Sequence, residues 1–257
     1  MYMQIKIKKP YSFCETGKRD NNEDSIFPEK GNANEYDKLF IVCDGIGGYK
    51  YGEIVSSVVC KTLSSFLCKV KSFDRNIFQQ ALDVAYDELD KMCDSCLIDN
   101  KAGTTLALLY LYEKGAFMAH IGDSRIYHLR KDGDKIKIVY QSEDHSFVND
   151  LIKLGVITPE KASTHPKRNI ITKAMQPYQE QRDEAEIYEM YDVKKGDYFF
   201  LCTDGVLERL DNEKLCSIFN LDVSLRKKGE IIKETCQNRS KDNFSAYLIA
   251  VDNVKTE

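Results

Sequence analysis

The sequence is poor in residues that interrupt a compact chain. Only 5 prolines and 14 glycines occur among 257 residues, and no stretch is linker-like, of low complexity or internally repeated. No apolar run approaches the ~20 residues that a membrane-spanning helix needs. Residues 1–13 alternate in the manner of a strand and lack the apolar segment of a secretory signal. We therefore expect one domain over residues 1–257 and no membrane partner.

An excess of charge of one sign is also missing, because the net charge is −4 and both signs are interspersed. This balance argues against a general nucleic-acid-binding surface. The nine cysteines are scattered. Their one close pair, Cys93 and Cys96, falls on a helical pattern, and a single CxxC is weak evidence for zinc. With 42% hydrophobic and 30% charged residues, the composition predicts a cytoplasmic globular protein with reduced cysteines.

Eight segments rich in β-branched and aromatic residues predict strands. They are residues 3–9, 38–44, 104–112, 116–123, 125–130, 135–141, 197–204 and 244–251. The four segments between residues 104 and 141 predict a meander, because Glu113–Gly115 and Asp132–Asp134 are short connections of turn type.

Helical periodicity marks four longer segments. They are Glu53–Val70, Asp74–Cys96, Leu207–Phe219 and Ser224–Cys236. Residues 144–181 differ, with one short helical pattern and no long strand, and we interpret them as a small flap subdomain. Antiparallel strands with helices grouped in the sequence favour an α+β layered sandwich over a doubly wound parallel sheet.

Acidic residues stand at the ends of several predicted strands. Asp44, Asp123 and Asp204 each end one, and Asp242 shortly precedes the last. Each acid taken alone is most simply a turn or cap residue. If the sheets align these ends, however, the carboxylates repel one another unless cations are present. Oxygen ligands without paired His or Cys suit Mg²⁺ or Mn²⁺ rather than Zn²⁺.

A glycine-rich turn follows Asp44. Gly45 would leave a backbone carbonyl open to a metal ion, and Gly47 and Gly48 would let the chain turn into the helix that begins near Gly52. A phosphate-binding loop does not fit, since Lys50 takes the last glycine position of GxGxxG and no GK[ST] follows.

Arg19 lies four residues before Glu23, which is followed by Asp24. An arginine beside clustered acids is most often a structural ion pair. Next to two metal ions it is also a suitable fork for a phosphoryl group. The residues alone therefore leave a structural role and a phosphate-binding role open.

Eight segments of the sequence resemble, in the same order along the chain, the motifs of the metal-dependent protein phosphatases of the 2C type, and the bacterial branch is the most similar. They are residues 19–24, 42–53, 102–109, 119–127, 142–158, 165–175, 198–206 and 241–249. The resemblance runs from about residue 12 to residue 251. It implies an α-β-β-α sandwich of two antiparallel sheets flanked by helices. It also implies hydrolysis of phosphoserine and phosphothreonine in proteins by a water or hydroxide held between two Mn²⁺ or Mg²⁺ ions.

The resemblance assigns roles residue by residue. Asp44 matches the carboxylate shared by both ions, with the Gly45 carbonyl on one of them. Asp204 and Asp242 match ligands of the other ion. Glu23 and Asp24 match acids that hold the ions directly or through water.

Two further roles and the partners follow from the same resemblance. Asp123 matches an acid that, with Asp204, binds a third and looser ion. Arg19 matches the arginine that grips the phosphate, and residues 144–175 match a flap that influences substrate choice. The implied partners are phosphorylated proteins, with a Ser/Thr kinase and its substrates among them, and we expect a monomer.

The sequence also departs from the family pattern. Ile46 stands where many eukaryotic members carry a histidine proposed as general acid, and Ser245 stands where threonine is common. Alternatives are a catalytically silent binding or sensor module, a hydrolase of small phosphate esters and a structural divalent-ion site. The silent module would be expected to have lost metal-binding acids, and all of them are present.

Overall fold

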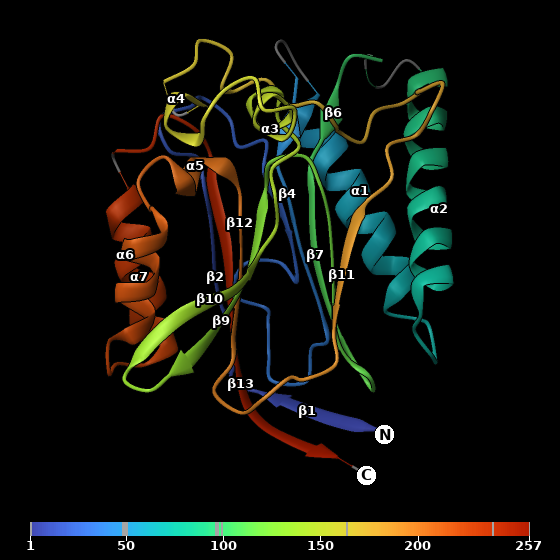
Figure 1. Ribbon diagram of the computed structural model, residues 1–257. Coiled ribbons are helices and arrows are strands. Elements are labelled where there is room, and N and C mark those ends of the chain that lie inside the picture. Colours follow the sequence, from blue (N-terminus) through green and yellow to red (C-terminus); the bar gives the residue numbers. More distant parts are fainter. Residues whose placement is uncertain are drawn as a thin grey trace.

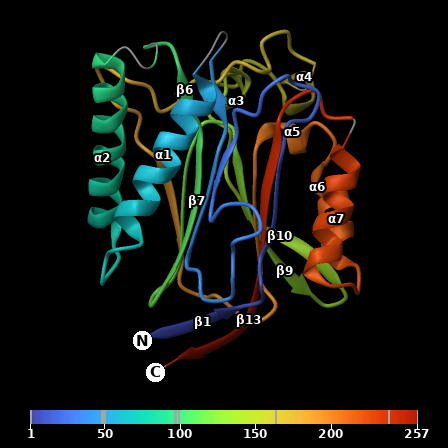
Figure 2. The same ribbon diagram turned by 180° about the vertical axis from the view of Figure 1, so that it is seen from behind.

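Two antiparallel sheets pack face to face between two pairs of helices (Figure 1). The computed structural model describes residues 2–47, 51–95, 98, 100–162, 164–237 and 239–256. The helix pair α1 (Gly52–Leu67) and α2 (Arg75–Asp94) covers one sheet, and α6 (Asn212–Asn220) with α7 (Leu225–Cys236) covers the other, as the reverse view also shows (Figure 2). The predicted layered α+β sandwich is confirmed.

Within the described residues, one sheet has six strands in the order β1-β13-β12-β9-β10, with β2 also paired to β13. Its strands are β1 (Met3–Ile7), β2 (Tyr11–Glu15), β9 (Arg125–Asp132), β10 (Lys135–Gln141), β12 (Tyr198–Cys202) and β13 (Phe244–Thr256). The long β13 pairs with β1, so the two ends of the described chain lie together.

The second sheet has five strands in the order β11-β8-β7-β4-β3 over the same described residues. They are β3 (Ser25–Phe27), β4 (Leu39–Cys43), β7 (Leu106–Tyr112), β8 (Gly115–Ile121) and β11 (Glu186–Met190). A short ribbon of β5 (Gly45–Ile46) and β6 (Gly103–Thr104) extends beyond β4. Every residue of β4, β7 and β8 is buried, which is why these strands read as continuous apolar runs rather than alternating ones.

Three apolar layers follow from this stacking. Side chains around Phe78 and Phe117 fill the space between α1, α2 and the five-stranded sheet. Phe40 and Tyr247 meet between the two sheets, with ring centroids 5.2 Å apart. Phe200 and its neighbours pack beneath α6 and α7. Both sheets are therefore buried on both faces, which fixes the ends of their central strands relative to one another.

Two predictions need correction. The four strands between residues 104 and 141 do not form one meander: β7 pairs with β8 in one sheet and β9 with β10 in the other. The chain changes sheets at Gly122, whose φ is +96°. The predicted helix Leu207–Phe219 is also two segments, α5 (Asp204–Leu207) and α6, because the Asp211 side chain accepts the Lys214 N–H (2.8 Å) and caps a new helix.

The other predicted helices are confirmed within a few residues. Asp74 caps α2 by accepting the Ile77 N–H (2.9 Å), and Ser224 caps α7. Cys96, the predicted end of α2, lies outside the described residues, as do Gly48 and Lys50. No helix in the described part of the chain is long and apolar enough to span a bilayer.

The predicted flap region contains two short helices, α3 (Phe147–Lys153) and α4 (Pro159–Ala162). Its two ends are bridged to each other between Ser146 and Ile171, and a second bridge joins Met175 to Thr104 of β6. It lies over the end of the sandwich where α5 and β6 are labelled (Figure 1). This is also the end at which β4 and β12 finish.

Candidate metal centre

The predicted acids meet at one end of the sandwich. β4 ends immediately before Asp44, and β12 ends two residues before Asp204. Asp123 lies in the turn between β8 and β9, and Asp242 stands two residues before β13. Antiparallel pairing within each sheet and the packing of the two sheets bring these ends to the same end of the sandwich. There each carboxylate lies in the electrostatic field of others.

The segment that carries Arg19, Glu23 and Asp24 joins this cluster. The Arg19 guanidinium donates to the Asp242 carboxylate (2.7 Å). The Gly45 N–H donates to the Glu23 carbonyl (3.1 Å), and the Thr203 hydroxyl donates to the Asp24 carboxylate (3.1 Å). All seven predicted side chains and Gly45 are thus gathered in one place.

A network of hydroxyl groups fixes the backbone of Asp44. Its N–H donates to the Thr105 hydroxyl, and its carbonyl accepts from the Thr105 N–H, both at 2.9 Å. The Thr105 and Ser124 hydroxyls lie 2.7 Å apart. Because Ser124 follows Asp123, this network links the backbones that carry two of the clustered acids.

Burial and mutual repulsion raise the pKa of these acids. Burial is the largest cause for Asp24 and Asp123, and neighbouring carboxylates add to it, so that the pKa of each rises to about 8. The same causes raise the pKa of Asp204 to about 6 and that of Asp44 well above its usual range. Without cations Asp24, Asp44 and Asp123 would hold protons at neutral pH, whereas Asp204 would be mostly charged. The fully ionised cluster therefore needs more positive charge than Arg19 alone supplies.

Several buried oxygens in the cluster lack a hydrogen-bond partner. They are Oδ1 of Asp24, Asp123 and Asp204 and Oε2 of Glu53. Unpaired buried carboxylate oxygens are costly, and here they are the hard oxygen donors that Mg²⁺ and Mn²⁺ prefer. The residues present therefore fit a divalent-ion centre.

Glu53 is a member of this group that the sequence analysis missed. It occupies the first turn of α1, where an acid ordinarily interacts with the helix dipole. In the fold it faces Glu23, and after burial its charge is the next cause that raises the Glu23 pKa. The sequence signal available was its place directly after the glycine turn.

Gly45 is needed for close packing. A Cβ there would lie 2.3 Å from the Gly52 carbonyl oxygen and 2.6 Å from that of Glu23. The space beside it is filled by the backbone at the start of α1 rather than left open. Close packing against the Gly52 and Glu23 backbone therefore explains why residue 45 is a glycine. That the Gly45 carbonyl binds a metal ion stays a prediction.

In the described residues, the histidines contact groups other than the clustered carboxylates. His128 is buried beside Asp197, at the start of β12 and so at the opposite end from Asp204. His120 and His145 stack on each other with centroids 4.6 Å apart. His165 contacts Lys167 within the flap.

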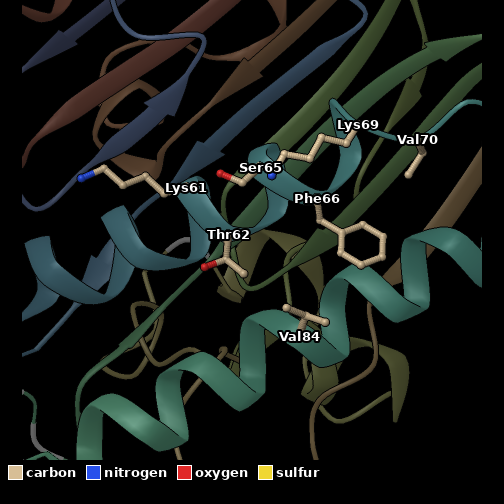
Figure 3. Close-up of a pocket in the computed structure, with 7 residues that line it drawn as sticks. All are labelled: Lys61, Thr62, Ser65, Phe66, Lys69, Val70 and Val84. Carbon is tan, nitrogen blue, oxygen red and sulfur yellow. The ribbon is translucent and has the colours of Figure 1, made fainter.

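The described pockets do not coincide with the acid cluster. A groove of about 570 Å³ lies between α1 and α2 (Figure 3), where Phe66 and Val84 come from facing helices and Lys61 and Lys69 from α1 and the loop that follows it. It is open and mostly apolar. Nothing in it resembles the acidic site at the end of the sheets.

Comparisons with known proteins give the same family. Residues 16–243 match the model of the protein phosphatase 2C family. The chain is 29% identical over 246 residues to the protein phosphatase PhpP of Streptococcus pneumoniae, covering 93% of this chain and 96% of that protein. It is 30% identical over 241 residues to a putative 2C-type phosphatase of Streptococcus pyogenes, covering 90% and 92%.

Solved structures agree on the fold. The serine/threonine phosphatase Stp1 of Staphylococcus aureus superposes with a TM-score of 0.79 at 29% identity and 95% coverage of both chains. The catalytic domain of the phosphatase PstP, solved with two manganese ions, has a TM-score of 0.79 at 23% identity and covers 97% of this chain and 100% of that one. By sequence and by fold, this chain belongs to the protein phosphatase 2C family.

Proposed function

We propose that this chain is an active, metal-dependent phosphatase that hydrolyses phosphoserine and phosphothreonine in proteins. The observation that carries the proposal is the cluster of buried and half-buried acids, several with a buried and unpaired oxygen, beside an exposed arginine. A silent binding module has no need to keep such a cluster, because unpaired buried carboxylates cost stability.

The proposed ligands are the acids that the fold gathers. Asp44 would be shared by two Mn²⁺ or Mg²⁺ ions, with the Gly45 carbonyl on one of them. Asp204 and Asp242 would serve the other. Bound ions would offset the charge of the carboxylates and of the phosphate, and would activate a water for attack on phosphorus.

The remaining acids have supporting roles in this proposal. Asp24 accepts from Thr203 and is almost fully buried, so one of its oxygens is oriented and the other is left for a ligand. Glu23 lies nearer the surface and would act directly or through water. Asp123, with Asp204, would hold a third and looser ion.

Arg19 is placed to grip the phosphoryl group. Its side chain is 59% exposed and is held at the cluster by a single bond to Asp242. A guanidinium carries five N–H donors, so this contact leaves donors for a phosphoryl oxygen pair. Ile46 cannot donate a proton to the leaving alcohol, and we assign that proton to water.

We also propose that residues 1–257 act as one domain and as a monomer, with residues 144–181 as a flap beside the bound phosphoprotein. The pairing of β1 with β13 supports this arrangement, since it ties the first and last strands into one sheet. A Ser/Thr kinase and its substrates are the partners that the chemistry suggests. The flap argues for protein substrates over small phosphate esters.

The test is hydrolysis of p-nitrophenyl phosphate and a phosphothreonine peptide, each with EDTA, Mg²⁺ or Mn²⁺. Metal-dependent release from both substrates, abolished in Asp44→Asn with unchanged circular dichroism, would support the proposal. Release from the small ester alone would favour a general phosphoesterase. If folded protein binds Mn²⁺ and releases nothing, the silent module is the better account.

A further inference from the structure

The turn that carries Asp123 is held from outside by the first two residues of the flap. On its N-terminal side, the Gly122 N–H donates to Nδ1 of His145, and the His145 N–H donates to the Gly122 carbonyl, both at 3.0 Å. On its C-terminal side, Arg125 forms a fork with the Asp144 carboxylate at 2.5 and 2.6 Å. Asp123 therefore lies between two anchored residues.

Gly122 depends on His145 for its backbone orientation. Its φ of +96° is a conformation that other residues rarely adopt, and a Cβ would lie 2.6 Å from the Thr105 side chain. The peptide is thus turned out of the β8 ladder toward the flap. The ring of His145, which is 6% exposed, supplies the acceptor that this buried N–H needs.

The His145 ring is itself locked in place. It stacks on His120 at an interplanar angle of 7°, and its Nε2 lies 3.5 Å from the Glu186 carboxylate. Burial, then the charges of His120 and Lys173, lower the pKa of His145 to about 4, although Glu186 opposes them. At neutral pH the ring is neutral, so Nδ1 can accept while Nε2 carries the proton.

His120, His145 and Glu186 also form a group whose donor atoms lie within 4.8 Å of one another. A metal ligand pair needs the lone pairs of both imidazoles to converge, and these lie in the ring planes. Because the two rings are nearly parallel, their lone pairs do not converge. We interpret the group as a support for His145 rather than as a second metal site.

His145 also joins the flap to this turn. Its carbonyl accepts the Thr172 N–H (2.9 Å), and the next residue, Ser146, bridges to Ile171. The two ends of the flap therefore meet at His145. We propose that His145 is a positioning residue, which sets the orientation of Asp123 through the Gly122 peptide and so couples the flap to the metal site. This inference rests on the proposed function, in which Asp123 is a ligand.

Two substitutions of similar size at His145 separate its role as hydrogen-bond acceptor for the Gly122 N–H from the effect of side-chain volume. In His145→Asn, Oδ1 takes the position of Nδ1 and keeps the Gly122 bond, whereas His145→Gln places its amide near Nε2 and loses it. His128→Gln is the matched control, since His128 is a fully buried histidine at the far end of the sheet.

The first readout is hydrogen exchange of the Gly122 amide in ¹⁵N-labelled, metal-free protein. We expect protection to survive in His145→Asn and exchange to be about 10-fold faster in His145→Gln, the equivalent of one lost hydrogen bond. Unchanged protection in both variants would overturn the contact on which the inference rests, whatever the enzyme does.

The second readout is the kcat for a phosphothreonine peptide at saturating Mn²⁺. We expect His145→Gln to lose about 10-fold in kcat with little change in KM, as for groups that orient a ligand, and His145→Asn to stay near wild type. His128→Gln should lower Tm and leave kcat unchanged. Equal kcat in the two His145 variants would overturn the proposal.

A double variant tests whether His145 acts through Asp123. Added to Asp123→Asn, His145→Gln should cause no further loss of kcat, and a further 10-fold loss would refute the coupling. If wild-type protein shows no turnover, the proposed function fails, and the amide exchange still decides whether the hydrogen bond between Gly122 and His145 exists. If His145→Gln does not fold, loss of kcat in folded His145→Asn would overturn the proposal and wild-type kcat would support it.

Discussion

Gly45→Ala adds one methyl group at the point where the candidate metal centre meets α1. The new Cβ would lie 2.3 Å from the Gly52 carbonyl oxygen, 2.4 Å from its carbon and 2.6 Å from the Glu23 oxygen, where ordinary contacts begin at 3.4 Å. Every one of these atoms is backbone, so no rotamer change relieves the overlap. The start of α1 or the Glu23 segment must move by about 1 Å.

Overpacking of this kind costs about 1–3 kcal/mol. In a domain of this size that corresponds to a fall in Tm of about 2–12 °C. The displacement also separates Glu23 from Asp44, and a misplacement of about 1 Å can cost about 100-fold in rate. We therefore expect a folded but less stable protein with strongly reduced kcat, although the carbonyl at position 45 is retained.

Gly47→Ala is the matched control in the same turn. Its Cβ would be 3.3 Å from the Gly52 N and 3.9 Å from Ala102, so the neighbours need to give only a few tenths of an ångström. Differential scanning calorimetry and Mn²⁺-dependent turnover would be measured on both variants. If Gly45→Ala matches Gly47→Ala in Tm and in kcat, the close-packing argument is wrong.

Three other predictions follow from the site. Arg19→Ala should raise KM for a phosphopeptide by about 10-fold or more, because it removes the proposed phosphate contact. Tm should change little, since the exposed ion pair with Asp242 adds at most about 1 kcal/mol to the free energy of unfolding. An unchanged KM would show that Arg19 does not bind the phosphate. Asp123→Ala should keep the two tighter Mn²⁺ ions in a calorimetric titration but lose most of kcat, and unchanged kcat would count against a third ion. Because the His145 pKa is lowered, the neutral ring contributes stability above pH 6.5 that is lost as the pH falls toward about 4. Over that range the free energy of unfolding of metal-free wild type, measured in urea, should fall by about 1–3 kcal/mol more than that of His145→Asn. Equal falls would contradict a neutral His145 ring.

The strands and the acids at their ends could be predicted from the sequence, but the division into sheets could not. Strands such as β4 and β7 are apolar on every residue, because one face packs against helices and the other against the opposite sheet. The two-residue period that assigns a strand to one face is therefore lost. The change of sheet rests on one residue, Gly122, in a turn that resembles any other.

Two of the strands that were not predicted, β11 and β3, were missed for another reason. β11 (Glu186–Met190) is an edge strand with mostly half-buried residues, and β3 (Ser25–Phe27) has three residues. Neither has enough periodicity to stand out from a loop. Their pairing is decided by neighbours far away in the sequence, as Glu186 opposite His120 shows.

Glu53 and His145 show the same limit within the site. An acid in the first turn of a helix and a histidine in a polar segment each have an ordinary local explanation. What marks them is a partner distant in the chain: the Glu23 carboxylate for one and the Gly122 peptide for the other. Residue type and spacing therefore predict the ligands better than the groups that orient them.

The two ends of β12 show how a functional acid differs from a structural one. Asp197, at its start, is fully buried, yet Arg130 holds both its oxygens at 2.7 Å and His128 lies 3.2 Å away. Burial alone would raise its pKa, but these partners bring it below the usual range. Asp204, at the other end, is half-buried among other acids, and burial followed by the charge of Asp242 raises its pKa to about 6. Both acids flank the same strand in the sequence, and it is the fold that brings the Arg130 guanidinium to Asp197. The other end holds several carboxylates and one exposed arginine, Arg19, which pairs with Asp242. This excess of negative charge is the reason why we propose that the metal ions bind there.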